Sequence, residues 1–292
     1  MRVALIGSQE FGKAALEAFL ERGDEVVAVF CPPDNSKATK PEILKETALA
    51  RGLTMLQFPS LKGPEAAQAM RDSKADICVM AYVLQFVPQD LVKIPRFGTI
   101  QYHPSLLPKY RGPSAIGWSI AGEIILQKEA PIGPDDTLGQ VYFNHLFPLG
   151  IQALLEAADL VAAGKHKEIV QDESQANYEG WFDQAAARIH WSNHVNQIYN
   201  LIRACNPAPG AWTPLNGEKV QIYDVRKHVT ATFGSVKGKP GEIVEIGNDS
   251  FKVACHGGQI EILKAKVGKG SKVSGAELSA SLGLQLGQFF DA

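Results

Sequence analysis

The side chains best suited to catalysis lie in one short loop, where His103 and Arg111 stand at the two ends of the string HPSLLPKYR. The loop follows an apolar, strand-like run at residues 97–102, and Pro104 and Pro108 keep it from continuing as a helix. A histidine that leaves the end of a buried strand occupies the place where an open α/β sheet usually carries its chemistry. Its imidazole could donate a hydrogen bond or a proton to a reacting group. From these residues alone, a surface loop without a function remains the alternative.

The whole segment 101–112, QYHPSLLPKYRG, resembles the signature loop of the formyltetrahydrofolate-dependent formyltransferases. That family carries the pattern His-x-Ser-Leu-Leu-Pro-x-x-Arg-Gly, and the resemblance places its catalytic histidine at His103. It also implies that Ser105, Leu107 and Arg111 belong to the substrate site.

Gln101 bears on the subgroup within that family. Amine formyltransferases place an asparagine two residues before the histidine, where it steadies the formyl oxygen. The hydrolase domain of 10-formyltetrahydrofolate dehydrogenase departs from this pattern, and so does Gln101. The segments LQKE at 126–129, PDDT at 134–137 and PGAWT at 209–213 are also most similar to that hydrolase domain. The resemblance therefore favours hydrolysis, with His103 and Gln101 as the catalytic residues.

A second loop, residues 82–88, follows the continuous apolar run at 76–81, which is typical of a strand covered on both faces. It leaves the predicted sheet at the same edge as the signature loop. In the family this loop holds the pterin ring of the folate through backbone groups. The resemblance thus implies that Gln85, Phe86 and Val87 line the pterin pocket. Without it, a strand-to-helix connection with core aromatics would be the simpler interpretation.

The family's catalytic aspartate has no counterpart in this sequence. Relatives carry a strand and a turn of the pattern Gly-Leu-Asp-x-Gly after the helix that we expect at residues 113–122. Here a predicted strand at 124–128 follows Glu123 with almost no connection, although loops this short do exist. Asp135 and Asp136 do not fill the gap, because they begin the next helix, where aspartates cap free amides.

The missing aspartate affects the expected chemistry. Attack on a formamide carbonyl creates an oxyanion, which His103 would stabilise by a hydrogen bond or a proton. An aspartate would hold the imidazole, raise its pKa and accept a proton from the attacking water or amine. Two accounts stay open: a true deletion that leaves an inactive folate-binding protein, or a mobile loop between Glu123 and Ile124 that the printed sequence lacks. We favour the second, which predicts a chain discontinuity there and an intact mass above 31.6 kDa.

The first residues predict a βαβ unit of a parallel sheet, with strands at 2–7 and 25–30 and a helix at 11–22. A dinucleotide site is the obvious hypothesis for such a unit. However, the turn GSQEFG lacks the middle glycine of G-x-G-x-x-G, which lets the backbone approach a pyrophosphate. No acidic residue closes the second strand either, so we expect no NAD on this chain.

The composition of the chain limits which partners, metal sites and cellular locations are expected. The chain has 292 residues and a formal net charge of −2, which argues against bulk nucleic acid or an acidic membrane as a partner. Its four cysteines show no paired short spacing, so we expect reduced thiols, no zinc site and a cytoplasmic protein. The start of the chain does not read as a signal peptide, and no apolar run approaches the roughly 20 residues of a membrane helix.

The second half of the chain changes from helical to strand patterns. A long apolar helix is expected at 138–163, followed by a polar connector at 164–176. The proline and glycine cluster at 206–210 marks a boundary, and short strands then follow at 219–225, 241–246, 251–255 and 259–266. Their spacing suggests a small open barrel. Lysines cluster near its end: Lys264, Lys266, Lys269 and Lys272. They could form a solvated face or meet an acceptor such as transfer RNA.

These inferences combine into one prediction. The fold is α/β, a Rossmann-like, mostly parallel sheet of the formyltransferase type, followed by a small C-terminal open β-barrel. Its parts are a catalytic domain at 1–187, a linker helix at 188–209 and an OB-like domain at 210–292. The resemblance implies hydrolysis of 10-formyltetrahydrofolate to tetrahydrofolate and formate, without a metal. Formyl transfer to an amine, on methionyl-tRNA or an amino sugar nucleotide, and an inactive folate-binding protein are the alternatives. A further domain could follow Ala292.

Overall fold

The chain folds into two compact units, which we describe separately. The computed structural model describes residues 1–34, 40–83, 85–111, 123–180, 182–230 and 236–290. The first unit contains Met1–Pro131 and His145–Trp181, and the second contains Ile132–Asn144 and Phe182–Ala292. The helix expected at 113–122 therefore lies outside the described residues.

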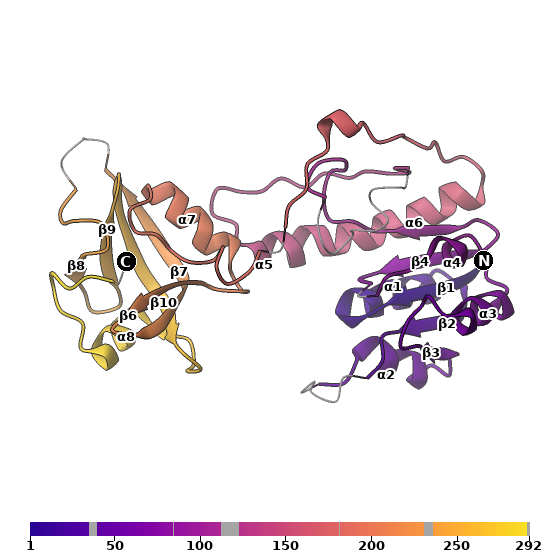
Figure 1. Cartoon of the computed structure of the whole chain (residues 1–292), viewed down its shortest axis with the longest axis horizontal. Helices are drawn as coiled ribbons and strands as arrows, with labels where there is room; N and C mark the ends of the chain where they lie inside the picture. The colour runs from indigo at the N-terminus through magenta and orange to yellow at the C-terminus, as the bar shows by residue number, and fades with distance from the viewer. Residues whose placement is uncertain (35–39, 84, 112–122, 181, 231–235, 291–292) are drawn as a thin grey trace. The chain divides into compact units, whose positions relative to one another are not determined.

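The first unit is built on a five-stranded parallel sheet in the order β3-β2-β1-β4-β5. The strand arrows β4, β1, β2 and β3 lie one below the other in Figure 1. The strands are β1 Arg2–Gly7, β2 Glu25–Cys31, β3 Met55–Gln57, β4 Ile77–Ala81 and β5 Thr99–Gln101. The helices are α1 Gln9–Glu21, α2 Ile43–Ala50, α3 Pro64–Ser73, α4 Gln89–Val92, α6 Phe147–Ala162 and the 3-10 turn η3 Glu173–Gln175. The Rossmann-like parallel sheet that the sequence predicts is confirmed.

Helices cover both faces of this sheet because alternate strand residues point to opposite sides. Val3, Leu5 and Val79 pack into one cluster with side chains of α1, α2 and α6. Ala4, Ile6 and Met80 pack into the other with side chains of α3 and α4. The three-layer arrangement explains why these strands are apolar on both faces.

The long helical stretch Leu138–Ala162 is made of α5 Leu138–Gln140, the π-helix η2 Val141–Leu146 and α6. By length and composition alone it could cross a membrane, with a mean hydropathy of 1.2 in its most apolar window. Its α6 part instead packs Leu154, Ala158 and Val161 into the core of the first unit. The core helix of a soluble protein passes the same test, so this stretch is weak evidence for a membrane span.

The prediction of a strand at 124–128 is wrong. Of these residues only Ile124 makes a strand-like contact, an isolated antiparallel bridge to Ile169. Gln127 and Lys128 use their side chains instead, on the carbonyl of Leu107 and the carboxylate of Glu156. An apolar run forms a strand only where a neighbouring strand pairs with its backbone, and here the pairing stops after one residue.

The second unit is a mostly antiparallel sheet in the order β6-β7-β10-β9-β8, with β11 paired to β10. Its strands are β6 Ala211–Leu215, β7 Glu218–Val229, β8 Ile243–Ile246, β9 Phe251–Cys255, β10 Gly258–Val267 and β11 Val273–Ser274. Its helices include α7 Val195–Ala204 and α8 Gly275–Leu282. A C-terminal antiparallel β domain follows the parallel sheet, as the change of sequence pattern predicts.

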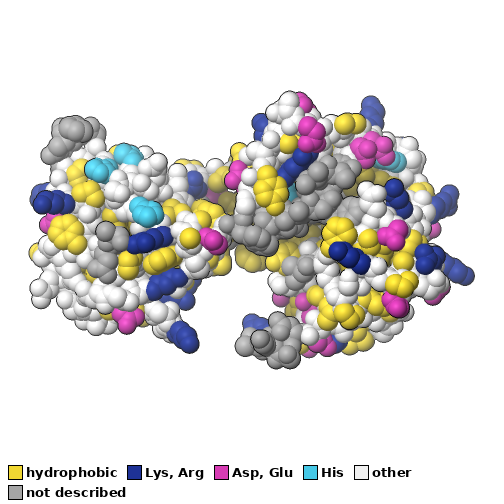
Figure 2. Space-filling model, in the orientation of Figure 1, with side chains coloured by type: hydrophobic (Ala, Val, Ile, Leu, Met, Phe, Trp, Pro, Cys, Tyr) yellow, Lys and Arg dark blue, Asp and Glu magenta, His cyan; other side chains and the backbone are white. Residues whose placement is uncertain are grey.

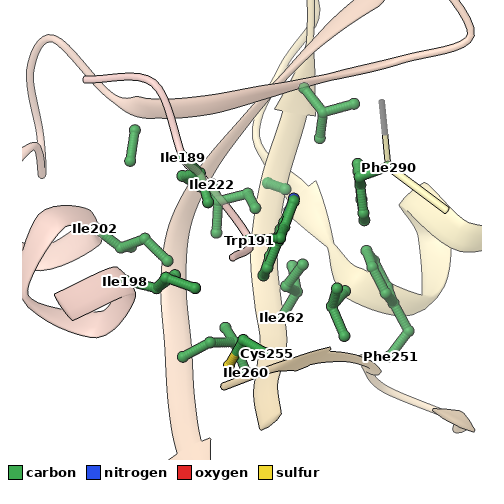
Figure 3. Packing of buried hydrophobic residues seen from close by; sticks show 14 of the residues in the cluster. Ile189, Trp191, Ile198, Ile202, Ile222, Phe251, Cys255, Ile260, Ile262 and Phe290 are labelled. Carbon is green, nitrogen blue, oxygen red and sulfur yellow. The ribbon is translucent and has the colours of Figure 1, made fainter. Parts of the chain in front are cut away.

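The core of the second unit is a single apolar cluster, part of which Figure 3 shows. Trp191 lies at its centre, stacked on Phe290 with ring centroids 5.4 Å apart, and its indole N–H donates to Thr213 Oγ1 at 3.1 Å. Helix α7 turns Ile198 and Ile202 into the same cluster. The segment expected to be a linker helix is therefore part of this core, because its apolar residues recur at helical spacing.

Residues 132–144 also pack with the second unit, although the sequence analysis assigned them to the catalytic domain. Tyr199 Oη donates to Asp135 at 2.8 Å, and the guanidinium of Arg203 donates to the carbonyls of Gly133 and Asp136. The cap of α5 is Thr137, which forms a capping box with Gln140. The sequence predicted that Asp135 and Asp136 cap this helix, and that prediction is wrong, because Thr137 is the cap.

Candidate functional site

The two loops singled out from the sequence leave the parallel sheet at the same edge. Strands β4 and β5 are paired in parallel with Met80 opposite Gln101, so residues 82–88 and 102–111 begin side by side. Gly7 of β1 lies opposite Ala81 on the other side of β4. The carboxyl ends of adjacent parallel strands therefore bring the predicted pterin loop and the signature loop together, where open α/β sheets bind ligands.

His103 is half-buried just beyond β5. Its Nε2 lies 3.4 Å from the carbonyl oxygen of Tyr110, a long hydrogen bond across the loop. Its Nδ1 is buried and has no hydrogen-bond partner among the described residues. Burial lowers the pKa of His103 below its ordinary value of 6.5, and the contact with the Tyr110 carbonyl partly opposes this effect. The imidazole is thus mostly neutral at neutral pH.

Gln101, the last residue of β5, carries a second buried polar atom without a partner in the described part of the chain, Oε1. A buried polar atom that makes no hydrogen bond is costly, roughly 1–3 kcal/mol. Two such atoms, on residues two apart, are what a site prepared for a polar ligand would leave open. The structure therefore keeps Gln101 and His103 together as a candidate polar pair.

The middle of the signature loop is held by its own bonds. Ser105 Oγ donates to the carbonyl of Lys109 at 3.1 Å, and the Ser105 N–H donates to the carbonyl of His103 at 2.9 Å. The carbonyl of Leu107 accepts from Gln127 Nε2 at 2.9 Å. Ser105 and Leu107 thus shape the loop, and their role in substrate binding stays a prediction.

Arg111 is only 5% exposed, and its guanidinium is fully engaged within the first unit. It donates to both carboxylate oxygens of Glu173, at 2.7 and 2.8 Å, and to Oε1 of Gln171, at 2.6 and 3.2 Å. This two-pronged geometry is the strong form of an arginine–carboxylate pair. In this structure Arg111 ties the signature loop to a segment about 60 residues later, and its contact with substrate stays a prediction.

The three residues of the predicted pterin loop lie in different surroundings. Gln85 Nε2 donates to the carbonyls of Phe58 and Pro59, at 3.0 and 3.3 Å, and so pins the loop to the end of β3. Phe86 is 54% exposed, with Lys62 Nζ 4.8 Å from the ring centroid. Val87 is fully buried in the core on the α3 side. Of these three side chains only that of Phe86 is mostly exposed, so Gln85 and Val87 could line a pocket mainly through their backbone.

The N-terminus of α1 does not resemble an open phosphate site. The N–H of Gln9 donates to the carboxylate of Glu42, which also accepts from the N–H of Leu44 at the start of α2. A carboxylate thus occupies the place where a pyrophosphate would meet the helix N-terminus. A Cβ added to Gly7 would lie 2.4 Å from the carbonyl oxygen of Ala81, so this glycine serves the packing of β1 against β4.

Two of the lysines near the end of the second unit lie against an aromatic ring. Lys272 Nζ lies 3.6 Å and Lys266 Nζ 6.0 Å from the ring centroid of Tyr223. Burial and the neighbouring Lys266 and Lys264 lower the pKa of Lys272. Figure 2 shows lysine and arginine side chains beside apolar ones on the visible face of this unit.

His194 has a structural role in the second unit. His194 Nδ1 accepts from the N–H of Asn196 and forms a capping box with Gln197 at the start of α7. Within the described ranges, no group of three or more His, Cys, Asp or Glu side chains is arranged to hold a metal ion.

The partners of the signature loop in the segment 171–179 could not be identified from the sequence. The polar residues there, Gln171, Glu173 and Asn177, looked like those of any surface connector. Their hydrogen bonds to Tyr110 and Arg111 join residues about 60 positions apart, and no local sequence pattern predicts hydrogen bonds over that separation. Arg111 was itself the signal, since an arginine this close to a buried strand needs a carboxylate partner.

Comparisons with known proteins agree with this arrangement. Residues 1–121 match the Formyl transferase family and residues 182–283 match the Formyl transferase, C-terminal domain family. The mitochondrial 10-formyltetrahydrofolate dehydrogenase of Homo sapiens is 35% identical over 270 residues, covering 84% of this chain. The chain spans only about a quarter of that relative, 28% of its length.

A shorter relative matches along most of its length. The methionyl-tRNA formyltransferase of Geotalea uraniireducens (strain Rf4) is 31% identical over 285 residues, which cover 90% of this chain and 89% of the relative. Among solved structures, HypX from Aquifex aeolicus in complex with tetrahydrofolic acid superposes with a TM-score of 0.62 and 17% identity. It covers 100% of this chain and 51% of the HypX chain. At that identity the likeness concerns the fold.

Proposed function

Because the chain belongs to the formyltransferase family, we propose that it acts on 10-formyltetrahydrofolate and transfers the formyl group to water. The products would be formate and tetrahydrofolate. The observation that carries this proposal is a pair of buried polar atoms at the end of β5, His103 Nδ1 and Gln101 Oε1, which have no hydrogen-bond partner in the described part of the chain. They stand where the signature loop begins and beside the loop that we expect to hold the pterin.

The reaction breaks the bond between the formyl carbon and N10 and forms a bond to the oxygen of water. Attack of water turns the formyl oxygen into an oxyanion. In the neutral tautomer that donates from Nε2 to the Tyr110 carbonyl, Nδ1 of His103 is an acceptor and would take the proton of the attacking water. The imidazolium N–H formed in this way would stabilise the oxyanion, an effect that in water-excluded sites is typically about 3–4 kcal/mol per donor. The water proton must leave during attack, and the departing N10 must gain one. A neutral imidazole with a lowered pKa is suited to exchange protons near neutral pH.

Hydrolysis is favoured over transfer to an amine by two features of the sequence. Gln101 replaces the asparagine that steadies the formyl oxygen in amine formyltransferases. The dehydrogenase relative of Homo sapiens is also slightly more similar than the methionyl-tRNA formyltransferase, at 35% against 31% identity. The lysines around Tyr223 are the observation that supports an anionic acceptor such as a transfer RNA.

A protein that binds folate without turnover is the third candidate, because the printed sequence lacks the family's aspartate. The residues described between Glu123 and Ile132 offer one carboxylate, Glu129, in addition to Glu123 itself. An intact mass above 31.6 kDa would show that the protein carries further residues. The expected discontinuity between Glu123 and Ile124 stays a prediction.

One experiment separates the three candidates. The protein is incubated with 10-formyltetrahydrofolate alone, and formate and tetrahydrofolate are measured. Equal amounts of both support hydrolysis. Release of tetrahydrofolate only after an amine acceptor is added would mean formyl transfer. A rise in melting temperature with folate, but no product in either case, would mean an inactive folate-binding protein.

A further inference from the structure

The signature loop contains one backbone conformation that the loop cannot hold by itself. Tyr110 has a φ of 57°, in the left-handed region that side chains other than glycine rarely adopt. Its side chain is 59% exposed, so packing of the ring does not force this conformation. Something else must fix the backbone at this residue.

The segment 171–179, which we call the clamp segment, provides that support. The side-chain oxygen of Asn177 accepts from the Tyr110 N–H at 2.6 Å, and the Asn177 carbonyl accepts from the Arg111 N–H at 3.1 Å. The carbonyl of Arg111 accepts from the Glu179 N–H at 2.7 Å. Three bonds therefore grip the backbone on both sides of the Tyr110 carbonyl.

The amide of Asn177 is oriented by a second bond. Its Nδ2 donates to Glu179 Oε1 at 3.0 Å, so its oxygen faces the Tyr110 N–H. One residue further on, the guanidinium of Arg111 is fixed by Glu173 and Gln171. Side-chain and backbone bonds of the clamp segment thus converge on two consecutive residues of the signature loop.

The carbonyl between these two residues is the one that meets the histidine. His103 Nε2 lies 3.4 Å from Tyr110 O, and this is its only hydrogen bond to a described residue. Rotation of the Tyr110 backbone out of the left-handed region would turn that carbonyl away. The ring of His103 would then lose the contact that orients it and leaves Nδ1 for the reaction.

From this chain of contacts we infer that the clamp segment is a positioning device for His103, with Asn177 as its central residue and the Arg111–Glu173 pair as its anchor. The inference deepens the proposed function, on which its catalytic part rests. Asn177 does not touch the reacting atoms in this account. It acts through the backbone of Tyr110, at a distance of about 70 residues in the sequence.

The test compares two substitutions at one position. Asn177→Ala removes the acceptor for the Tyr110 N–H, whereas Asn177→Asp keeps a side-chain oxygen there. We expect Asn177→Ala to lower kcat by roughly ten- to a hundredfold, since small displacements of a catalytic group have effects of that size. The dissociation constant for folate should change less than threefold. Asn177→Asp alone would set its carboxylate against that of Glu179, so it is combined with Glu179→Gln, whose amide can donate to it, and this pair should recover most of the lost kcat.

The pKa of His103 can be measured without enzyme turnover and provides a second readout. Burial lowers the pKa of His103 and the Tyr110 carbonyl raises it, and these are the two influences on the group. Loss of the carbonyl contact should therefore move the pKa of His103 further down. An NMR titration of histidine-labelled protein measures this shift, and the His103→Gln spectrum assigns the signal.

Two further variants make the result specific. Glycine adopts the left-handed conformation without strain, so in a Tyr110→Gly background the additional effect of Asn177→Ala should shrink to less than threefold. Glu168→Gln alters an exposed ion pair with His166 in the same connector, outside the clamp segment, and should leave both readouts unchanged.

The outcomes separate this inference from the proposed function. An unchanged pKa of His103 in Asn177→Ala would overturn the inference, and so would a loss of kcat matched by an equal loss of folate binding. If the wild-type protein releases no formate, the proposed function fails. The NMR titration would then still decide whether the clamp segment positions the histidine.

Discussion

The core of the second unit and the carboxyl edge of the first unit's sheet differ in backbone conformation and in how their polar groups are hydrogen-bonded. In the former, Trp191 is buried and stacked on Phe290, its N–H is bonded, and helices α7 and α8 begin with capping boxes. At the latter, three non-glycine residues have left-handed backbones: Gln9, Tyr82 and Tyr110. Two buried polar atoms there lack partners among the described residues. Packed and hydrogen-bonded side chains serve stability, whereas left-handed backbones and unpartnered buried polar atoms gathered at one sheet edge are typical of a functional site.

The largest effect on activity is expected from substitution of His103 at the carboxyl edge of the sheet. His103→Ala should lower turnover by about 10²- to 10⁴-fold, because it removes the group that stabilises the oxyanion and exchanges the proton. Folate binding and the melting temperature should change little. The measurement is kcat for formate release beside a folate titration. A variant with near wild-type kcat would remove His103 from the mechanism.

The opposite response is expected in the second unit. Trp191→Ala should lower the free energy of unfolding of this unit by about 3–5 kcal/mol, the usual cost of deleting a buried aromatic side chain. Leu286→Ala is the matched control, because Leu286 belongs to the same unit and is 66% exposed. Chemical denaturation followed by near-UV circular dichroism checks both. Equal losses in the two variants would contradict the packing described for Trp191.

Much of the second unit could be predicted because its strands follow one another and pair locally. The proline and glycine boundary and four strand segments were identified from alternation and turns alone. Helix α7 was misread as a linker, although Val195, Ile198 and Ile202 recur at helical spacing and predict a buried face. A boundary signal directly after the helix outweighed that pattern in the sequence analysis.

The site was predicted less completely, for physical reasons. The parallel strands and the position of His103 follow from short apolar runs and from the signature string. The bonds of Arg111 to Glu173 and of Tyr110 to Asn177 depend on contacts across some 60 residues, which no periodicity reveals. The strand expected at 124–128 failed because an apolar run cannot show whether a partner strand is present. Trp118, in the helix expected at 113–122, lies outside the described residues.

A ligand should stabilise the first unit selectively. At a concentration 100 times its dissociation constant, a non-hydrolysable folate analogue should add about 2.7 kcal/mol to the free energy of unfolding. NAD and NADP should add nothing, since Glu42 occupies the N-terminus of α1. Differential scanning fluorimetry with the three ligands makes this comparison. A shift with NAD or NADP and none with folate would overturn the assignment of the loops at 82–88 and 102–111.

The smallest expected effect is a pH dependence of stability. The pKa of His103 is lowered by burial, so between that lowered pKa and 6.5 the unfolded chain binds more protons than the folded chain. Stability therefore rises with pH in this window and is lost as the pH falls through it. His103→Gln should remove this dependence, and urea denaturation from pH 5 to pH 7.5 would detect it. Parallel curves for the two proteins would mean that His103 is not desolvated.

The central claim is that water receives the formyl group. The most direct measurement is turnover of 10-formyltetrahydrofolate in water enriched in oxygen-18, with the formate examined by mass spectrometry. Hydrolysis predicts one oxygen-18 atom in each formate, with tetrahydrofolate formed in equal amount and the signal lost in His103→Ala. Absence of labelled formate, or formyl found on an added amine in its place, would contradict the account.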